Sequence, residues 1–170
     1  MKVHHGRGPR RYYEQEGRGL DIHVLEATTY TRLKEQGLCD RGIVPDFLGF
    51  MRKFDPSLCQ PHLRKFLDDE YPPSAIFLEY ITSLGMINLR DYTPQRVNNL
   101  LKGIRQIHKT QRVVWLDFDR AETYDKDHIT VREDDLINEE EAIVMEFKDA
   151  IAVDIVKGKF DETYLFSFGS

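Results

Sequence analysis

The sequence contains little cysteine and no long hydrophobic run, and each absence excludes a class of protein. Its two cysteines, Cys39 and Cys59, show no Cys-x-x-Cys or histidine spacing, so neither a disulfide framework nor a zinc site is predicted. No apolar run approaches the roughly 20 residues that span a bilayer. The N-terminal Met-Lys-Val-His-His-Gly-Arg lacks the apolar segment of a secretory signal. We therefore expect an intracellular, cytoplasmic protein without a membrane segment, in a reducing compartment.

An excess of positive charge is also lacking. The chain carries 24 Lys and Arg against 29 Asp and Glu, for a net charge of −5, which argues against a general nucleic-acid partner. The charge is uneven, because residues 1–19 hold five basic and two acidic side chains, whereas residues 117–141 hold eleven acidic and three basic ones. The first segment could be a phosphate-facing or RNA-binding arm, and the second could hold metal. A solvated loop or helix face is the more common explanation of each.

The 170 residues suit one domain, and their apolar periodicity predicts its elements. Helices are expected at 21–36, 93–108 and 138–156, and strands at 1–4, 47–51, 75–81 and 112–116. A short helix at 62–69 is expected inside a segment, 54–74, that holds four of the seven prolines. The order of these elements predicts an α+β fold with a small sheet and packed helices.

Helix ends are predicted from capping chemistry. Asp21 can cap the first helix and Gly37 can stop it. Thr93 is a good N-cap with Pro94 at the first helical position. Gly158 is expected to end the last helix.

Several polar residues stand where chemistry is conceivable. Asp117 follows the apolar strand Val113–Leu116, and a carboxylate on a turn after a buried strand can reach a divalent ion. Taken in chain order, Lys2, Glu26, Leu78-Glu79-Tyr80, Ile107-His108 and Asp117-Phe118-Asp119 resemble the order of motifs in protein kinases.

The resemblance is to the degenerate protein-kinase-like proteins that are abundant in filamentous fungi. Four segments carry it: Glu26–Leu33, Gly42–Pro45, Phe77–Tyr80 and Trp115–Ala121. It covers nearly the whole chain and implies one incomplete protein-kinase-like domain of two lobes with a small antiparallel sheet. Residues 1–81 would be the remnant of the small lobe with the hinge, and residues 82–170 a reduced large lobe.

The resemblance implies a role for each matching residue. Lys2 would hold nucleotide phosphates and Glu26 would hold Lys2. Leu78 would line the adenine pocket, and the backbone of Glu79, Tyr80 and Ile81 would hydrogen-bond adenine. Asp117 would bind Mg²⁺, so ATP and Mg²⁺ are the implied cofactors. The plain alternatives are a surface Lys and Glu, a buried strand with a polar exit, and an acidic turn.

Parts that phosphoryl transfer needs are missing from the resemblance. It begins at the lysine strand, without the Gly-rich loop, and no Ala-Pro-Glu segment follows Asp117. Only four residues separate His108 from the strand at Val113, so the loop with the His-x-Asp base and the metal-binding Asn is absent. A positioned base alone contributes roughly 10²–10⁴-fold. No catalytic residue is predicted, and His108 is expected to be structural or capping.

Three functions follow from these observations. The first is a pseudokinase with at most weak ATP binding and no phosphoryl transfer. The second is an active ATP-dependent phosphotransferase, if the true product contains the catalytic loop. The third is a non-enzymatic interaction module. A misassigned intron, a decaying gene and selection for a scaffold explain the junction after His108 equally well. The substrate, the protein partner and the oligomeric state are not predicted.

Overall fold

The computed structural model describes residues 1–9, 12–13, 21–82, 93–111 and 129–163. It is an α+β structure in which the described residues form a three-stranded antiparallel sheet, three α-helices and two short 3₁₀-helices. The chain divides into two compact units, and the first holds residues 1–80. The second unit begins at Ile81.

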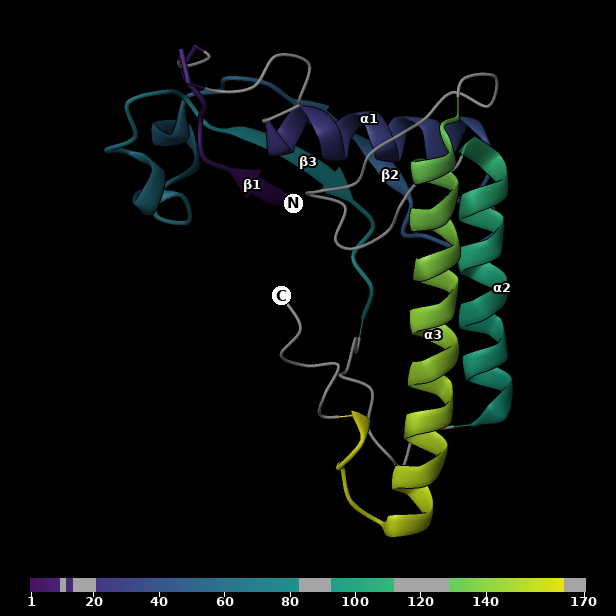
Figure 1. Cartoon of the computed structure of the whole chain (residues 1–170). Coiled ribbons are helices and arrows are strands. Elements are labelled where there is room, and N and C mark those ends of the chain that lie inside the picture. The colour runs from purple at the N-terminus through teal and green to yellow at the C-terminus, as the bar shows by residue number, and fades with distance from the viewer. Residues whose placement is uncertain (10–11, 14–20, 83–92, 112–128, 164–170) are drawn as a thin grey trace. The chain divides into compact units, whose positions relative to one another are not determined.

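The sheet of the first unit has its last strand in the middle (Figure 1). The strands are β1 (Lys2–His4), β2 (Phe47–Met51) and β3 (Ser74–Leu78), in the order β1-β3-β2. Lys2 lies opposite Ile76, and Phe47 lies opposite Leu78. The β2 prediction is confirmed, whereas β3 ends at Leu78, so the predicted continuation to Ile81 is wrong.

One helix, α1 (Ile22–Glu35), packs on one face of this sheet. Asp21 caps it as predicted, because its carboxylate accepts a hydrogen bond from the Val24 N–H at 3.3 Å. The ring of Tyr30 stacks on Phe47 of β2 with centroids 5.7 Å apart. The core between helix and sheet is completed by buried apolar side chains, among them Ala27, Leu33, Leu38 and Ile76.

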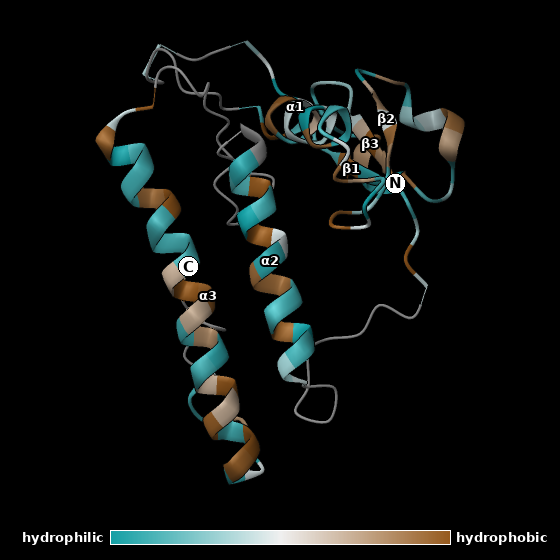
Figure 2. Cartoon of the chain, turned by 90° about the vertical axis from the view of Figure 1, so that its right-hand side faces the viewer, coloured by the Kyte–Doolittle hydropathy of each residue, from teal (hydrophilic) through white to brown (hydrophobic). Residues whose placement is uncertain are grey.

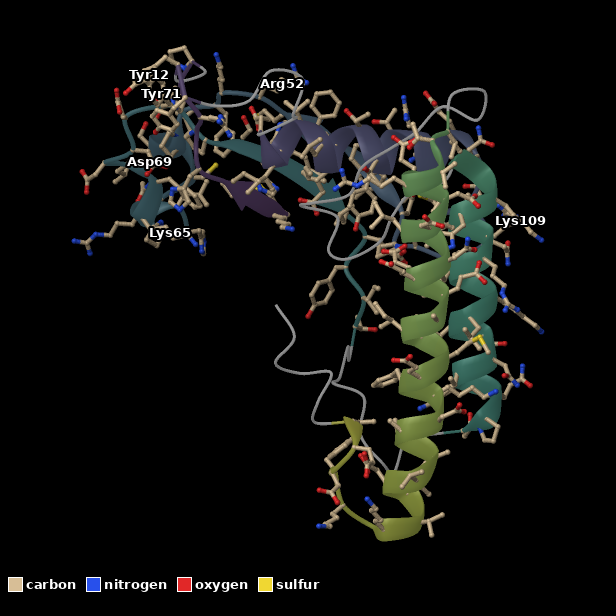
Figure 3. All side chains as sticks on the ribbon, in the orientation of Figure 1. Tyr12, Arg52, Lys65, Asp69, Tyr71 and Lys109 are labelled. Atoms are coloured by element: carbon tan, nitrogen blue, oxygen red, sulfur yellow. The ribbon has the colours of Figure 1, made fainter. Side chains whose placement is uncertain are left out.

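The proline-rich segment between β2 and β3 forms two 3₁₀-helices, η1 (Pro56–Cys59) and η2 (Arg64–Phe66), where one short helix at 62–69 was expected. Proline fixes φ and removes backbone donors, which favours short turns over a longer helix. Lys65 and Asp69 belong to this segment (Figure 3). His5 contacts Asp69 at 2.8 Å between Nδ1 and Oδ2, which joins the end of β1 to it.

The second unit contains two long helices that pack side by side, α2 (Pro94–Gln111) and α3 (Val131–Lys157) (Figures 1 and 2). Helix α2 begins at Pro94 as predicted but continues past His108, because Lys109 to Gln111 contain no helix breaker and basic side chains favour a helix C-terminus. The expected strand at 112–116 lies outside the described residues.

Helix α3 begins at Val131, so the predicted start at Asn138 is wrong. Thr130 and Glu133 form a capping box, in which each side chain bonds the backbone of the other residue. The acidic side chains after Thr130 belong to the segment 117–141, for which a metal site, a solvated loop and a helix face are the explanations offered by the sequence. They fill the first turns of the helix, where negative charge is stabilising.

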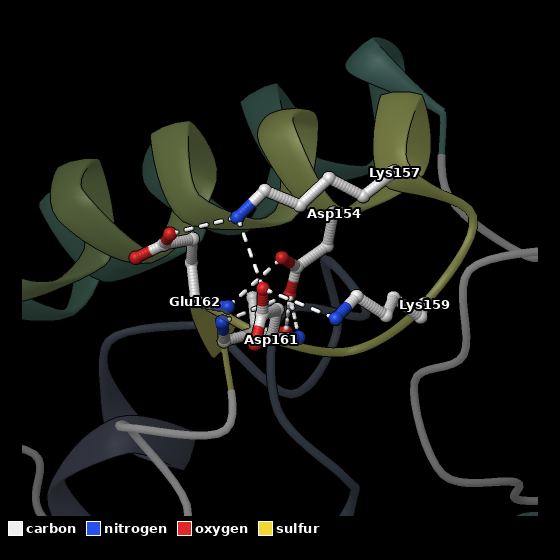
Figure 4. A network of polar contacts seen from close by, with 6 residues as sticks. Asp154, Lys157, Lys159, Asp161 and Glu162 are labelled. Atoms are coloured by element: carbon white, nitrogen blue, oxygen red, sulfur yellow. Dashed lines mark hydrogen bonds and ion pairs between the residues drawn. The ribbon is translucent and has the colours of Figure 1, made fainter.

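The C-terminal end of α3 is fastened by a buried carboxylate (Figure 4). Gly158 adopts φ 70° and ends the helix, as predicted. Asp154 then accepts hydrogen bonds from the backbone N–H groups of Asp161, Glu162 and Thr163 and from the Thr163 hydroxyl. Burial raises the pKa of Asp154, but these four donors outweigh it and hold that pKa well below the usual range.

The second half of α3 is apolar on more than one side (Figure 2). Ile151 is fully buried, whereas Met145, Val153 and Val156 are exposed. Even so, within the ranges described above, no helix has both the length and the apolar character that a membrane span needs.

Candidate functional site

Lys2 and Glu26, which the sequence predicts as partners, form an ion pair between β1 and α1. Lys2 Nζ lies 3.0 Å from Glu26 Oε1. The two side chains differ in exposure, because that of Lys2 is 44% exposed and that of Glu26 only 3%. The lysine can therefore reach solvent or a ligand, whereas the carboxylate is held in the protein interior.

Strand geometry brings Lys2 to α1. Residues directly opposite each other in an antiparallel pair project from the same face, and alternate residues along a strand share that face. Lys2 lies opposite Ile76, so Lys2, Ile76 and Leu78 share one face. Phe47, which is opposite Leu78, stacks on Tyr30 of α1, so this is the face that α1 covers.

His4 is a third member of this cluster, which the sequence analysis did not find. Its Nε2 lies 3.0 Å from Glu26 Oε2, although the contact lacks the alignment of a hydrogen bond and both atoms are buried. The His4 ring also meets His23 of α1 edge to face, with centroids 5.8 Å apart. The signal in the sequence is the period of two, which places Lys2 and His4 on the same face of one strand.

Burial and neighbouring groups lower the pKa of His4, and a neighbouring carbonyl oxygen decides which ring nitrogen of His23 carries a proton. Burial lowers the pKa of His4 below its ordinary value, and Lys2 and His23 lower it further, against the opposing effect of Glu26 and Asp21. His4 is therefore neutral at pH 7. His23 Nε2 lies 3.3 Å from the carbonyl oxygen of Ala75, which can only accept a hydrogen bond, so this nitrogen carries the proton.

The predicted hinge residues begin where β3 ends. Leu78 is the last residue of β3, and Glu79 and Tyr80 follow it as exposed residues. The Glu79 N–H donates to the Asp46 carbonyl oxygen at 2.8 Å, and Glu79 Oε2 accepts from the Asp46 N–H at 3.1 Å. Glu79 is thus fixed to the segment before β2. Ile81, the last predicted contact, is exposed and begins the second unit.

Asp117, the predicted Mg²⁺ ligand, lies outside the described residues. Among the residues that are described, no group of three or more His, Cys, Asp or Glu side chains could hold a metal ion. Because Asp117 is the one ligand on which the Mg²⁺ prediction depends, that prediction stays a prediction.

A second buried cluster joins α2 to α3. His108 Nε2 lies 2.8 Å from Glu140 Oε2, and His108 Nδ1 lies 3.3 Å from Glu141 Oε1. Arg105 Nε donates to the other oxygen of Glu141 at 3.0 Å. An imidazole can donate from both ring nitrogens only when it is protonated, so this geometry fits an imidazolium between two carboxylates.

The electrostatics of His108 agree with this geometry. Burial alone would lower the pKa of His108, but hydrogen bonds and charge from Glu140 and Glu141 outweigh burial and raise that pKa above its ordinary value. Through these contacts His108 joins α2 to α3, and that its role is structural stays a prediction. Its partners could not be predicted, because an isolated helix pattern does not identify which side chains meet across a helix pair.

A polar hollow of about 550 Å³ lies beside this second cluster. Arg105 and Lys109 of α2 line it together with Asp134, Asn138 and Glu141 of α3. Lys109 projects from the outer side of the helix pair (Figure 3). Since both signs of charge line the hollow, its chemistry does not select one kind of ligand.

No family model, no curated protein and no solved structure matches the chain. The function must therefore be argued from the geometry of these side chains.

Proposed function

We propose that the chain is a protein-kinase-like pseudokinase that binds ATP at most weakly and does not transfer its phosphoryl group. The observation that carries this proposal is the ion pair between Lys2 on β1 and Glu26 on α1. In protein kinases a strand lysine that holds the nucleotide phosphates is itself held by a glutamate on the next helix. The side chain of Lys2 is partly exposed, as a residue that must reach phosphate requires.

The sheet supports the same proposal. The strand that leads into the predicted hinge, β3, lies next to the lysine strand, and Leu78 shares the face of Lys2 and α1. Leu78 is only partly buried on the face that α1 covers, so a nucleotide that met Lys2 would have Leu78 available as an apolar neighbour for its base. The first compact unit ends at Tyr80, which fits a hinge at Glu79–Ile81.

The hinge geometry refines how adenine would be held. The Glu79 N–H is already engaged by the Asp46 carbonyl oxygen. A hydrogen bond between the Glu79 backbone and a base must therefore use the Glu79 carbonyl oxygen, which can accept from an exocyclic amino group of the base. This arrangement favours adenine over a base that offers only a carbonyl group at the same position.

Phosphoryl transfer is not expected, because the resemblance to protein kinases assigns no residue of this sequence as the base that would activate an acceptor hydroxyl. Helix α2 continues to Gln111, so the residues after His108 form helix where a catalytic loop would begin. ATP would therefore be a bound ligand of this protein and would not react. Lys2 would bind its phosphates, Glu26 would orient Lys2, and Asp117 would be the Mg²⁺ ligand if the metal binds.

A non-enzymatic interaction module is the second candidate function. Exposed apolar side chains in the second half of α3, including Met145, Val153 and Val156, favour it, because exposed apolar patches often mark contact surfaces. This function does not require nucleotide, so nucleotide binding separates the two candidates.

Thermal unfolding with and without ATP tests the proposal. We expect ATP to raise Tm in wild type and to lose this effect in Lys2→Met, since a ligand that binds the folded state stabilises it. Lys34→Met is a matched control, because Lys34 is 45% exposed and pairs with an acidic side chain, Asp46, at 3.2 Å. An unchanged Tm in wild type would remove nucleotide binding from the proposal, and an equal loss in both variants would contradict the role of Lys2.

The absence of transfer is tested in the same preparation. Incubation with ATP and Mg²⁺ should release or transfer no phosphoryl group above a protein-free blank. Transfer that disappears in Asp117→Ala would instead support the active phosphotransferase that the sequence left as an alternative.

A further inference from the structure

Both oxygens of the Glu26 carboxylate face a basic side chain of the same strand. Lys2 Nζ lies 3.0 Å from Oε1, and His4 Nε2 lies 3.0 Å from Oε2. The contact with Lys2 is a hydrogen bond, whereas the contact with His4 is not aligned as one. His4 is thus within reach of Glu26 without being its present partner.

Removal of Lys2 from Glu26 would leave an unpaired charge in the protein interior. The Glu26 side chain is 3% exposed, so water cannot replace the lysine, and a buried carboxylate without a partner is strongly unfavourable. A phosphate group that competes for Lys2 creates this situation. The nearest group that can supply a compensating positive charge is the imidazole of His4.

We propose that His4 is a positioning residue for Glu26: when Lys2 turns to the phosphates of a bound nucleotide, His4 takes up a proton from solvent and becomes the cationic partner of Glu26. This inference rests on the proposed nucleotide function of Lys2. The exchange balances in charge, since one cation leaves the carboxylate and one proton arrives. Nucleotide binding is then coupled to proton uptake, and by linkage a lower pH strengthens nucleotide binding.

The charged groups around His4 act in the required direction. On its own strand, Lys2 disfavours protonation of His4, so withdrawal of the Lys2 charge raises the pKa of His4. On α1, Glu26 favours protonation and His23 disfavours it, while Asp21 at the helix N-cap favours it weakly. On the neighbouring strand β3, the residue opposite His4 is the uncharged Ser74.

The first experiment needs no nucleotide. Proton NMR titration of the imidazole resonances, with His4 assigned by its loss in His4→Gln, gives the titration midpoint of His4 in wild type and in Lys2→Met. We expect the midpoint of His4 to rise in Lys2→Met, because the variant removes the competing cation. An unchanged or lowered midpoint overturns the inference. If Lys2→Met does not fold, Lys2→Gln replaces it, since the lysine side chain is partly exposed.

The second experiment measures protons taken up on nucleotide binding. Calorimetric titration with ATP in two buffers of different ionisation enthalpy should show net proton uptake in wild type, between about pH 5 and pH 8 where histidine titrates. His4→Gln should bind ATP with this uptake reduced. His5→Gln should keep it, since His5 is exposed and faces Asp69 instead of Glu26. Equal uptake in His4→Gln and wild type overturns the inference.

The two experiments separate failure of this inference from failure of the proposed function. If ATP does not bind at all, the proposed function fails, while the NMR midpoints still decide whether His4 responds to Lys2. If ATP binds but the titration midpoint of His4 is the same in Lys2→Met and wild type, the proposed function stands and the coupling of His4 to Lys2 is wrong.

Discussion

Each unit contains a histidine beside glutamate, His4 being largely buried and His108 buried, and the two arrangements are opposite. In the first unit one carboxylate, Glu26, faces two basic groups, Lys2 and His4. In the second unit one imidazole, that of His108, faces two carboxylates. The pKa of His4 is lowered and the pKa of His108 is raised, although burial acts downward on both.

The difference teaches that the partners decide whether the downward effect of burial on the pKa of a histidine prevails, as at His4, or is overcome, as at His108. At His4 a lysine already neutralises the available carboxylate, so a second positive charge gains little against the cost of desolvation. At His108 the imidazole lies between two carboxylates, of which only Glu141 is also paired with Arg105, so protonation of His108 relieves repulsion between them. In the first cluster Lys2 can therefore turn to a ligand, whereas in the second cluster the protonated His108 holds two helices together.

The largest expected effect comes from removing the cation of the second cluster. His108→Leu should destabilise the protein by about 3 kcal/mol, because Glu140 and Glu141 would be left as neighbouring carboxylates, one of them buried. Urea unfolding followed by circular dichroism measures it. Lys109→Ala, an exposed position on the same helix, should change stability by less than about 0.5 kcal/mol. Equal stability of His108→Leu and wild type would mean that the cluster is not a structural clamp.

A smaller effect is expected in the first cluster. Glu26→Gln should lower the free energy of unfolding by about 1.5 kcal/mol, the low end for hydrogen bonds to charged groups. The effect stays at this low end because the released Lys2 can turn to water. Asp46→Asn, which weakens the exposed pair with Lys34, should cost no more than about 0.5 kcal/mol in the same unfolding assay. If Glu26→Gln were as costly as His108→Leu, the contrast between the clusters would be wrong.

The smallest effect is in the pH dependence of stability, since a change of pH alters only the protonation of these side chains. The stabilisation from the raised pKa of His108 is complete below about pH 6.5 and is lost as pH rises through the folded-state pKa. The lowered pKa of His4 acts in the opposite sense, because stability is lost as pH falls from about 6.5 through its folded-state pKa. The slopes of unfolding free energy against pH in His108→Gln and His4→Gln should therefore change with opposite signs.

Local chemistry predicted much of the first unit. Asp21 and the apolar pattern after it predicted α1, and the apolar run Phe47–Met51 predicted β2, because caps and periodicity act within a few residues. The pairing of Lys2 with Glu26 came from the resemblance to protein kinases, since no local rule connects residues 24 positions apart.

The failures have physical causes as well. The start of α3 was missed because its acidic first turns resemble a solvated loop, although Thr130 and Glu133 carry the capping-box signature. The continuation of α2 past His108 was missed because a helix without a breaker ends where tertiary contacts allow. His4 was missed although the period of two places it beside Lys2 on one face of β1. Glu140 could not be found as a site residue, because its pairing with His108 is fixed by packing between helices.

The carboxylate of Asp154 also makes the end of α3 useful as an attachment point. Its bonds to the backbone of Asp161, Glu162 and Thr163 tie the chain beyond Gly158 back to the helix. Val156, two residues before Gly158 and 89% exposed, therefore stands on a helix end that resists fraying. A fluorophore at Val156→Cys would report on α3 itself, once the exposed thiol of Cys59 has been replaced.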